Sequence, residues 1–226
     1  MFKRPHHQRI HTLLQAFNVE LLMQTQCYFG GGTAIALQLG EYRESVDVDF
    51  VCAFSEGYRT LRNTVAEDNL GALLNAEVGY LRPVRFDQIG IRTILEVDGT
   101  PIKLEILSEG RIALSGRRTP DLPVPTLVPA DMFAEKLLAN ADRGQDRSVL
   151  SRDIIDLAVM IGHWGPIPEQ AWTKARAAYG AQLDRAYANA CRLIGDRRYL
   201  RSCLAEMQMD ADWLERIPAL LEPRRG

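Results

Sequence analysis

Hydrophobic residues near the start of the chain follow a helical pattern. From Ile10 to Leu22 they stand mostly three or four positions apart, which is the spacing that places side chains on one face of an α-helix. A short apolar run at residues 27–29 and three glycines follow, and residues 33–39 again have helical spacing. The pattern therefore predicts a helix, a short strand, a glycine turn and a second helix that ends at Gly40.

Strands are predicted where apolar and polar residues alternate. Residues 46–52 alternate apolar and acidic positions, and residues 102–107 also alternate, which is the period of a strand with one solvated face. A helix is expected at residues 56–69 between them. The sequence D-G-T-P at residues 98–101 is a turn signal, so we expect strands joined by turns up to residue 115.

The second half of the chain has helical patterns almost to its end. Prolines recur between residues 117 and 129, where we expect an extended connection and a domain boundary. Helices are predicted at residues 131–143 and 151–163, with three or four more after them. The predicted fold class is α+β: an α/β head with a mixed sheet and flanking helices, followed by a C-terminal helical bundle. The corresponding domains are residues 1–120 and 121–226.

Composition narrows the class of protein. Of the 226 residues, 46% are hydrophobic and 25% are charged, which is typical of a globular protein. The formal net charge of −2 argues against a protein that coats nucleic acid by charge alone. No apolar run approaches the roughly 18 residues that span a bilayer, and the N-terminus lacks the apolar core of a signal peptide. We therefore expect a cytoplasmic protein without a membrane partner.

Two carboxylates stand one residue apart in the strand predicted at residues 46–52. Asp47 and Asp49 are expected to project from the same face, about 6.5 Å apart at Cα. Adjacent unpaired anions repel and resist burial, so the pair needs a cation, solvent or raised pKa values. Two magnesium ions would satisfy it, and such a pair of ions assists both the attacking and the leaving oxygen. A solvated strand face is the alternative.

Three glycines, Gly30, Gly31 and Gly32, lie between the predicted strand and helix. Glycine lets the backbone approach a phosphate closely, and a helix N-terminus offers N–H groups to it. Thr33 adds a hydroxyl at the same point. The sequence thus indicates either a phosphate cradle or a tight turn with close packing.

Glu105 is a third acidic candidate. In K-L-E-I-L it shares one strand face with Lys103 and Leu107, because alternate residues of a strand point the same way. Its immediate neighbours are apolar. We expect either an exposed carboxylate or one aimed at the same cations as the first two.

The order of these motifs resembles a known family. G-G-T-A-I-A-L at residues 31–37, followed by R-E-S-V-D-V-D-F at 43–50, is similar to the nucleotidyltransferase-like AbiEii/AbiGii toxin family, part of the DNA polymerase β-like nucleotidyltransferase superfamily. A-D-M-F-A-E-K-L-L-A at 130–139 and S-R-D-I-I-D-L-A at 151–158 resemble its helical motifs. The resemblance covers residues 27–160.

The resemblance implies a role for each matching position. The glycine motif would bind nucleotide phosphates, the first two acids would bind metal, and a helix lysine would contact the triphosphate. The implied catalytic residues are Asp47, Asp49, Glu105, Lys136 and Asp153. The implied metal ligands are Asp47, Asp49 and Glu105. The implied nucleotide-binding residues are Gly31, Gly32, Thr33, Ser45 and Lys136.

An activity and partners also follow from the resemblance. A metal-dependent nucleotidyltransferase with two Mg²⁺ ions would transfer a nucleoside monophosphate from an NTP to an acceptor hydroxyl. The expected acceptor is the 3′ end of a tRNA, and a cognate antitoxin is expected to hold such a toxin in check. Residues 1–120 would be the catalytic domain, and residues 121–226 would contribute to its cleft. Two alternatives stay open: a nucleotide- or partner-binding module without transfer, and a transferase acting on a protein or small-molecule hydroxyl.

Individual side chains carry further expectations. Ser45 stands two residues before Asp47, so phosphorylation of Ser45 would add negative charge beside the metal site. Lys136 lies among apolar residues, so its ammonium is expected to reach outward as a point charge for phosphate. Ser151 is expected to cap the helix that follows it.

An arginine cluster and the N-terminal histidines are assigned to different parts of the surface. Arg197, Arg198 and Arg201 share a predicted helix face, which indicates either a contact with a nucleic-acid backbone or a solvated surface. The N-terminal histidines have no catalytic role in this interpretation. They are expected in an exposed N-terminal arm: His6, His7 and His11.

Overall fold

The computed structural model describes residues 2–221. The chain divides into two compact units, each with its own core. Unit 1 consists of Met1–Glu41 and Ser45–Val128, and unit 2 consists of Tyr42–Glu44 and Pro129–Gly226. The three residues of Tyr42–Glu44 therefore belong to unit 2 although both of their neighbours in the sequence belong to unit 1.

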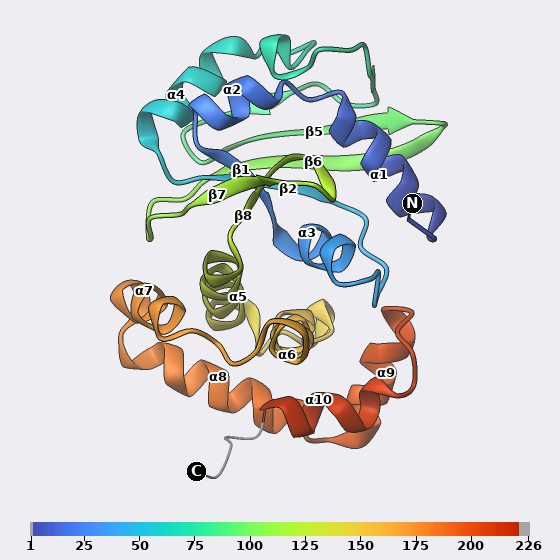
Figure 1. Cartoon of the computed structure of the whole chain (residues 1–226), viewed down its shortest axis with the longest axis vertical. Helices are drawn as coiled ribbons and strands as arrows, with labels where there is room; N and C mark the ends of the chain where they lie inside the picture. The colour runs from blue at the N-terminus through green and yellow to red at the C-terminus, as the bar shows by residue number, and fades with distance from the viewer. Residues whose placement is uncertain (1, 222–226) are drawn as a thin grey trace. The chain divides into compact units, whose positions relative to one another are not determined.

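Unit 1 is built on a mixed sheet (Figure 1). The order across the sheet is β3-β5-β6-β2-β1-β8-β7, with β4 beside β5. β1 is antiparallel to β2 and parallel to β8, and β2 is parallel to β6. The strands within the described residues are β1 Cys27–Gly30, β2 Val48–Cys52, β3 Gly79–Tyr80, β4 Arg85–Phe86, β5 Gly90–Val97, β6 Thr100–Ser108, β7 Gly116–Thr119 and β8 Leu122–Leu127.

Helices cover both faces of this sheet. In Figure 1, α1, α2 and α4 lie on one face and α3 lies on the other. Phe50 of β2 points to the first face, where its ring centroid is 4.9 Å from that of Phe17 and 5.5 Å from that of Phe29. The helices of unit 1 are α1 Pro5–Gln15, α2 Val19–Gln24, α3 Gly31–Gln38 and α4 Ser55–Thr64, with a 3-10 turn at Gly71–Leu73.

The first helix differs from the prediction. The apolar pattern from Ile10 to Leu22 is divided between α1 and α2, because Asn18 leaves the helix to donate its N–H to Leu73 O at 2.8 Å. The Asn18 side chain then caps α2 by accepting the N–H of Leu21. His7 is completely buried, so the expectation of an exposed N-terminal arm is wrong for this residue.

The proline-rich stretch is also different from the prediction. Instead of an extended connection, it forms the antiparallel strands β7 and β8, and the expected boundary at residue 120 lies in the turn between them. Pro123 and Pro125 lack an N–H, but the pairs that β8 makes use Leu122, Thr126 and Leu127. The prolines therefore sit outside these pairs.

Unit 2 is helical, and α5 packs against α6, α7 and α8. Together with the mixed sheet, this confirms the predicted α+β class. The helices are α5 Pro129–Arg143, α6 Arg152–Trp164, α7 Glu169–Tyr179, α8 Ala181–Ile194, α9 Arg197–Glu206 and α10 Trp213–Leu221, with a 3-10 turn at Arg147–Val149.

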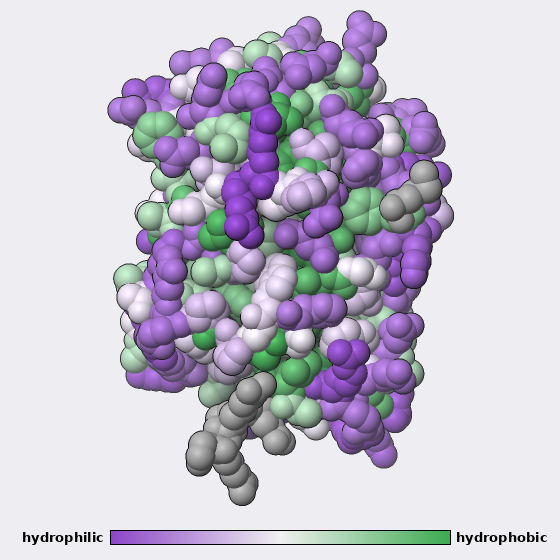
Figure 2. All heavy atoms as spheres, in the orientation of Figure 1, coloured by the Kyte–Doolittle hydropathy of each residue, from purple (hydrophilic) through white to green (hydrophobic). Residues whose placement is uncertain are grey.

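None of the helices over residues 2–221 is long and apolar enough to cross a membrane, and hydrophilic side chains are abundant on the face drawn in Figure 2.

Candidate functional site

Asp49 lies against the first turn of α3. In β2 it pairs with Gly30 of β1. A Cβ on Gly31 would stand 2.7 Å from Asp49 Oδ2, and Gly31 has a φ of +68°. Because other residues rarely adopt this φ and would collide with the carboxylate, glycine at position 31 lets the acid approach the helix N-terminus. The glycine motif and the acid motif are therefore brought together in space.

Charged residues continue across the sheet from Asp49. Glu105 of β6 is the register partner of Asp49, and Arg92 of β5 is the register partner of Glu105. Directly paired residues on neighbouring strands point to the same face. Their neighbours Phe50 and Ile106 are fully buried and point to the opposite face. One face of the sheet is thus apolar, while the face toward α3 carries the ionic groups at this level.

Glu105 is held by two cations. Arg92 Nε donates to Glu105 Oε1 at 3.2 Å, and Lys103 Nζ forms an ion pair with Glu105 Oε2. Burial lowers the pKa of Lys103, but the hydrogen bond to Glu105 and the charges of Glu105, Asp47 and Asp49 outweigh it and raise that pKa. All three predicted acids therefore act on the same ammonium group.

The carboxylates do not form a complete metal cage by themselves. Asp47 precedes β2, which begins at Val48. Over the described residues, no group of three His, Cys, Asp or Glu side chains is arranged to hold a metal ion. Asp47 and Asp49 carry carboxylate oxygens, which are the kind of ligand that Mg²⁺ prefers. Glu105 is directed toward Arg92 and Lys103 instead.

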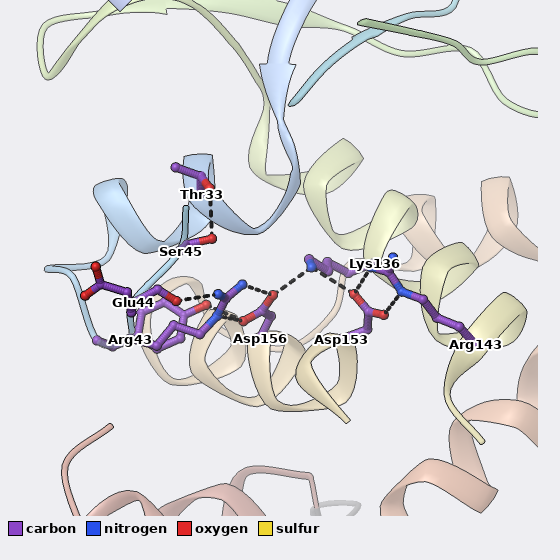
Figure 3. Close-up of polar contacts among 9 residues, drawn as sticks. Thr33, Arg43, Glu44, Ser45, Lys136, Arg143, Asp153 and Asp156 are labelled. Carbon is purple, nitrogen blue, oxygen red and sulfur yellow. Dashed lines mark hydrogen bonds and ion pairs between the residues drawn. The ribbon is translucent and has the colours of Figure 1, made fainter. Parts of the chain in front are cut away.

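The hydroxyl of Thr33 is used within the protein. Thr33 is buried, and its Oγ1 lies 2.8 Å from Ser45 Oγ (Figure 3). This bond ties the first turn of α3 to the segment before β2. Since the first N–H groups of a helix have no partner inside it, the backbone of Gly31 and Gly32, rather than the Thr33 hydroxyl, is suited to hold a phosphate.

Lys136 is buried in unit 2, contrary to the expectation that its ammonium reaches outward. Its Nζ lies 2.9 Å from Asp153 Oδ1 and 2.6 Å from Asp156 Oδ2 (Figure 3). The two aspartates are three residues apart on α6 and therefore share one face of that helix. The packing of α5 against α6 places Lys136 between them, and the apolar neighbours of Lys136 in the sequence do not reveal this.

Asp156 is the most heavily bonded carboxylate of the network. Tyr42 OH donates to Oδ1 at 2.6 Å. Arg43 binds with both arms of its guanidinium, Nε to Oδ1 at 2.7 Å and Nη2 to Oδ2 at 2.9 Å. No sequence-based prediction concerns Tyr42 or Arg43. The available signal was that Arg43 and Asp156 stand inside two of the motifs that carry the family resemblance.

Asp153 completes the network at its more exposed end. Besides Lys136, it accepts hydrogen bonds from Arg143 Nε at 2.7 Å and Arg143 Nη2 at 3.0 Å. The Arg143 side chain is 41% exposed, while that of Asp153 is 2% exposed. Three cations, those of Arg43, Lys136 and Arg143, meet two carboxylates in these contacts, so each carboxylate faces two positive charges.

Both aspartates of the network stay ionised. Burial raises the pKa of Asp153 and of Asp156, but the charge of Lys136 together with Arg143 or Arg43 outweighs it, and each pKa is lowered. Burial and the charge of Asp156 raise the pKa of Tyr42 well above its ordinary value. Tyr42 is therefore a neutral hydrogen-bond donor to an ionised carboxylate.

Ser151 and the basic cluster of α9 make contacts that their local sequence does not indicate. Ser151 is the residue before α6, as expected, but its side chain does not cap the helix. Its Oγ lies 3.0 Å from Tyr199 OH instead. In the basic cluster, Arg198 and Arg201 are exposed, and Arg197 is paired with Glu215.

The chain matches a family model and is similar to solved structures. The family model described as "Nucleotidyl transferase AbiEii toxin, Type IV TA system" matches residues 12–225. The structure of JHP933 from Helicobacter pylori is similar, with a TM-score of 0.53 and 14% identity over 98% of this chain and 92% of that chain. MenT4, a nucleotidyltransferase toxin from Mycobacterium tuberculosis, aligns with a TM-score of 0.35 and 16% identity over 90% and 95%. No curated protein matches the chain.

A Cβ at position 31 tests the contact between the glycine and Asp49. Gly31→Ala should lower the free energy of unfolding by about 1–3 kcal/mol more than Gly99→Ala, because it adds a collision to the backbone strain. Gly99 is the matched control, since its φ is +71° and its Cβ would meet no atom within 4 Å. Urea unfolding of both variants measures the difference, and equal losses would contradict a steric role for Gly31.

Asp156→Asn tests the buried network. It should lower the free energy of unfolding by about 3–5 kcal/mol, because Arg43 and Lys136 lose a buried counter-charge. Urea unfolding provides the measurement. Glu215→Gln is the control: it breaks an exposed ion pair with Arg197, and no measurable change is expected. Similar stability of both variants would show that the buried network contributes no more than a surface pair.

Acid should weaken the folded protein through the same aspartates. Their pKa values are lowered by folding, so their ionisation stabilises the protein above the unfolded pKa of about 4 and this stabilisation is lost as the pH falls. We expect the free energy of unfolding to fall between about pH 5 and pH 2, with a shallower slope in Asp153→Asn. The control is Asp98→Asn, at an exposed position, which should keep the wild-type slope of unfolding free energy against pH. Parallel curves for all three proteins would show that Asp153 is not the origin of the acid sensitivity.

Proposed function

The chain belongs to the AbiEii family of nucleotidyl transferase toxins, and we propose that it is a metal-dependent enzyme that transfers a nucleoside monophosphate from an NTP to the 3′ hydroxyl of a tRNA. The match confirms the resemblance drawn from the motifs. Nucleotidyl transfer, a toxin role and an antitoxin partner follow from the family. The metal, the tRNA acceptor and the residue roles are our proposal.

The contact between Gly31 and Asp49 is the observation that supports this proposal best. It brings a carboxylate suited to a cation beside backbone N–H groups suited to a phosphate. A nucleoside triphosphate with its divalent cation supplies both the cation and the phosphate that these groups would bind. The eight-residue helix α3 also directs the positive end of its dipole toward this point.

The acids of unit 1 are assigned as follows. Asp47 and Asp49 would hold Mg²⁺, which when bound neutralises phosphate charge and makes the acceptor hydroxyl more acidic. Glu105 lies beside Asp49 in the sheet register, and we assign it to receive the proton of the attacking hydroxyl. Its role as a third metal ligand would require it to separate from Lys103.

Lys136 is assigned to the triphosphate. Its ammonium forms ion pairs with Asp153 and Asp156, which fix the side chain, and we assign the third N–H of the ammonium to a phosphate oxygen. Asp153 and Arg143 act here as orienting groups, because an ammonium held in place loses less freedom when it binds its ligand.

The proposed reaction is a single in-line transfer. The acceptor oxygen attacks the α-phosphorus in line, the bond between the α-phosphorus and the bridging oxygen breaks, and pyrophosphate leaves. Exposed Arg198 and Arg201 on α9 are assigned to the RNA backbone. Arg197 contributes less, since Glu215 already neutralises it.

The test uses purified protein, α-³²P-labelled NTPs, MgCl₂ and total tRNA, followed by a denaturing gel. Asp49→Asn should lower transfer on the order of a thousandfold, because the cation loses a ligand charge. Asp98→Asn, the same change in the exposed turn after β5, should act as wild type.

The outcomes separate the alternatives. Label in tRNA with wild type and Asp98→Asn, but not with Asp49→Asn, supports the proposal, and full transfer by Asp49→Asn removes the site assignment. Label on a protein or small molecule, but not on RNA, contradicts the proposed acceptor. Nucleotide binding without any transfer would favour a binding module.

A further inference from the structure

The start of α1 is bonded to the segment that precedes the acidic pair. Glu41 accepts the backbone N–H of Lys3 at 2.6 Å and of Arg4 at 3.0 Å. Arg4 Nε also donates to the Glu41 carbonyl oxygen at 3.2 Å. The carboxylate therefore lies at the N-terminus of α1, where the helix dipole favours a negative charge. These N–H bonds and the contact with His7 outweigh the effect of burial and lower the pKa of Glu41.

His7 is at the centre of these contacts. It is 0% exposed. Its Nδ1 lies 2.9 Å from Glu41 Oε1, and its Nε2 accepts the backbone N–H of Ser45 at 3.2 Å. Because a backbone N–H can only donate, Nε2 carries no proton, and Nδ1 donates to Glu41. The buried imidazole is thus a neutral bridge between α1 and two points of one loop.

Two more contacts hold the same loop. His6 Nε2 lies 3.0 Å from the carbonyl oxygen of Val46. On the other side, Ser45 Oγ is bonded to Thr33 of α3. Residues 41, 45 and 46 are therefore fixed from α1, and residue 45 is fixed from the first turn of α3 as well. Asp47 follows directly.

The backbone of this loop needs such support. Gly40 has a φ of +78° and Glu41 has a φ of +59°. A non-glycine residue in the left-handed region is strained, and it persists only where its surroundings hold it there. The bonds from Lys3, Arg4 and His7 to Glu41 supply that restraint.

We propose that His7 is a positioning residue for nucleotidyl transfer. By fixing the Ser45 backbone, it holds Asp47 and Asp49 in place beside the first turn of α3. This inference rests on the function proposed above. His7 contacts no reacting group in the proposal and acts only through the loop. Misplacement of catalytic groups by about 1 Å can reduce a rate a hundredfold, so a hydrogen bond two residues from Asp47 is close enough to matter.

Two substitutions separate the functions of the imidazole. His7→Asn places an amide N–H near the position of Nδ1, so it keeps the donor to Glu41 and loses the acceptor for Ser45. His7→Gln places an amide oxygen near the position of Nε2, so it keeps that acceptor. His11→Asn is the matched control, because His11 lies on the same helix and is only partly buried.

The expected result is a loss of kcat that the glutamine variant restores. His7→Asn should lower kcat at least tenfold, with the KM for NTP within about threefold of wild type, since the phosphate-binding backbone is unchanged. His7→Gln and His11→Asn should stay within about threefold of wild type in both constants. Amide hydrogen exchange of Ser45, measured by NMR, should become faster in His7→Asn alone.

Each other outcome overturns the inference. Unchanged Ser45 exchange in His7→Asn would show that the bond does not hold the loop. Faster exchange with unchanged kcat would show that the loop position does not matter for transfer. Equal losses of kcat and melting temperature in the asparagine and glutamine variants would show a purely structural role.

Failure of the proposed function is recognised separately. If wild type transfers no nucleotide, that proposal fails, and the affinity for Mn²⁺, measured by isothermal titration calorimetry, decides the inference. Weaker Mn²⁺ binding by His7→Asn than by wild type and His7→Gln would support a role for His7 in positioning Asp47 and Asp49. Equal affinities would overturn it.

Discussion

A buried carboxylate that needs counter-charges organises the site of unit 2. Asp156 is 0% exposed, and an isolated ion at such a position would be strongly unfavourable. Tyr42, Arg43 and Lys136 meet its oxygens, and Lys136 extends the network to Asp153. The requirement to neutralise one buried charge therefore sets the position of the lysine assigned to the triphosphate and brings residues 42–44 into unit 2.

In unit 1 the acidic residue is placed by the absence of a side chain rather than by counter-charges. Asp49 can lie beside α3 because Gly31 has no Cβ. The loop before Asp47 is held by hydrogen bonds from His6 and His7 of α1. In both units the group that would touch a ligand is fixed by groups that would not. A nucleotidyltransferase depends on such preorganisation, because its protein groups mainly position phosphates and neutralise charge.

Much of this protein can be predicted from local sequence. The alternation at residues 102–107 and the helical spacing at 131–143 and 151–163 correspond to β6, α5 and α6. The glycines at the start of α3 and the acids at residues 47 and 49 are visible as motifs, and their order indicates the family. These features depend on periods of two and 3.6 residues and on short motifs, which a single stretch of sequence contains in full.

The tertiary structure alone decided which side chains meet. Arg43 and Asp156 are 113 positions apart in the sequence, so no local period links them, and Lys136 is surrounded by apolar neighbours that say nothing about its partners. His7 looks like part of a polar terminus until α1 packs beside the loop at Ser45. Sequence by itself thus determined the elements and the family, while long-range packing determined burial, ion pairing and the restraint of the loop.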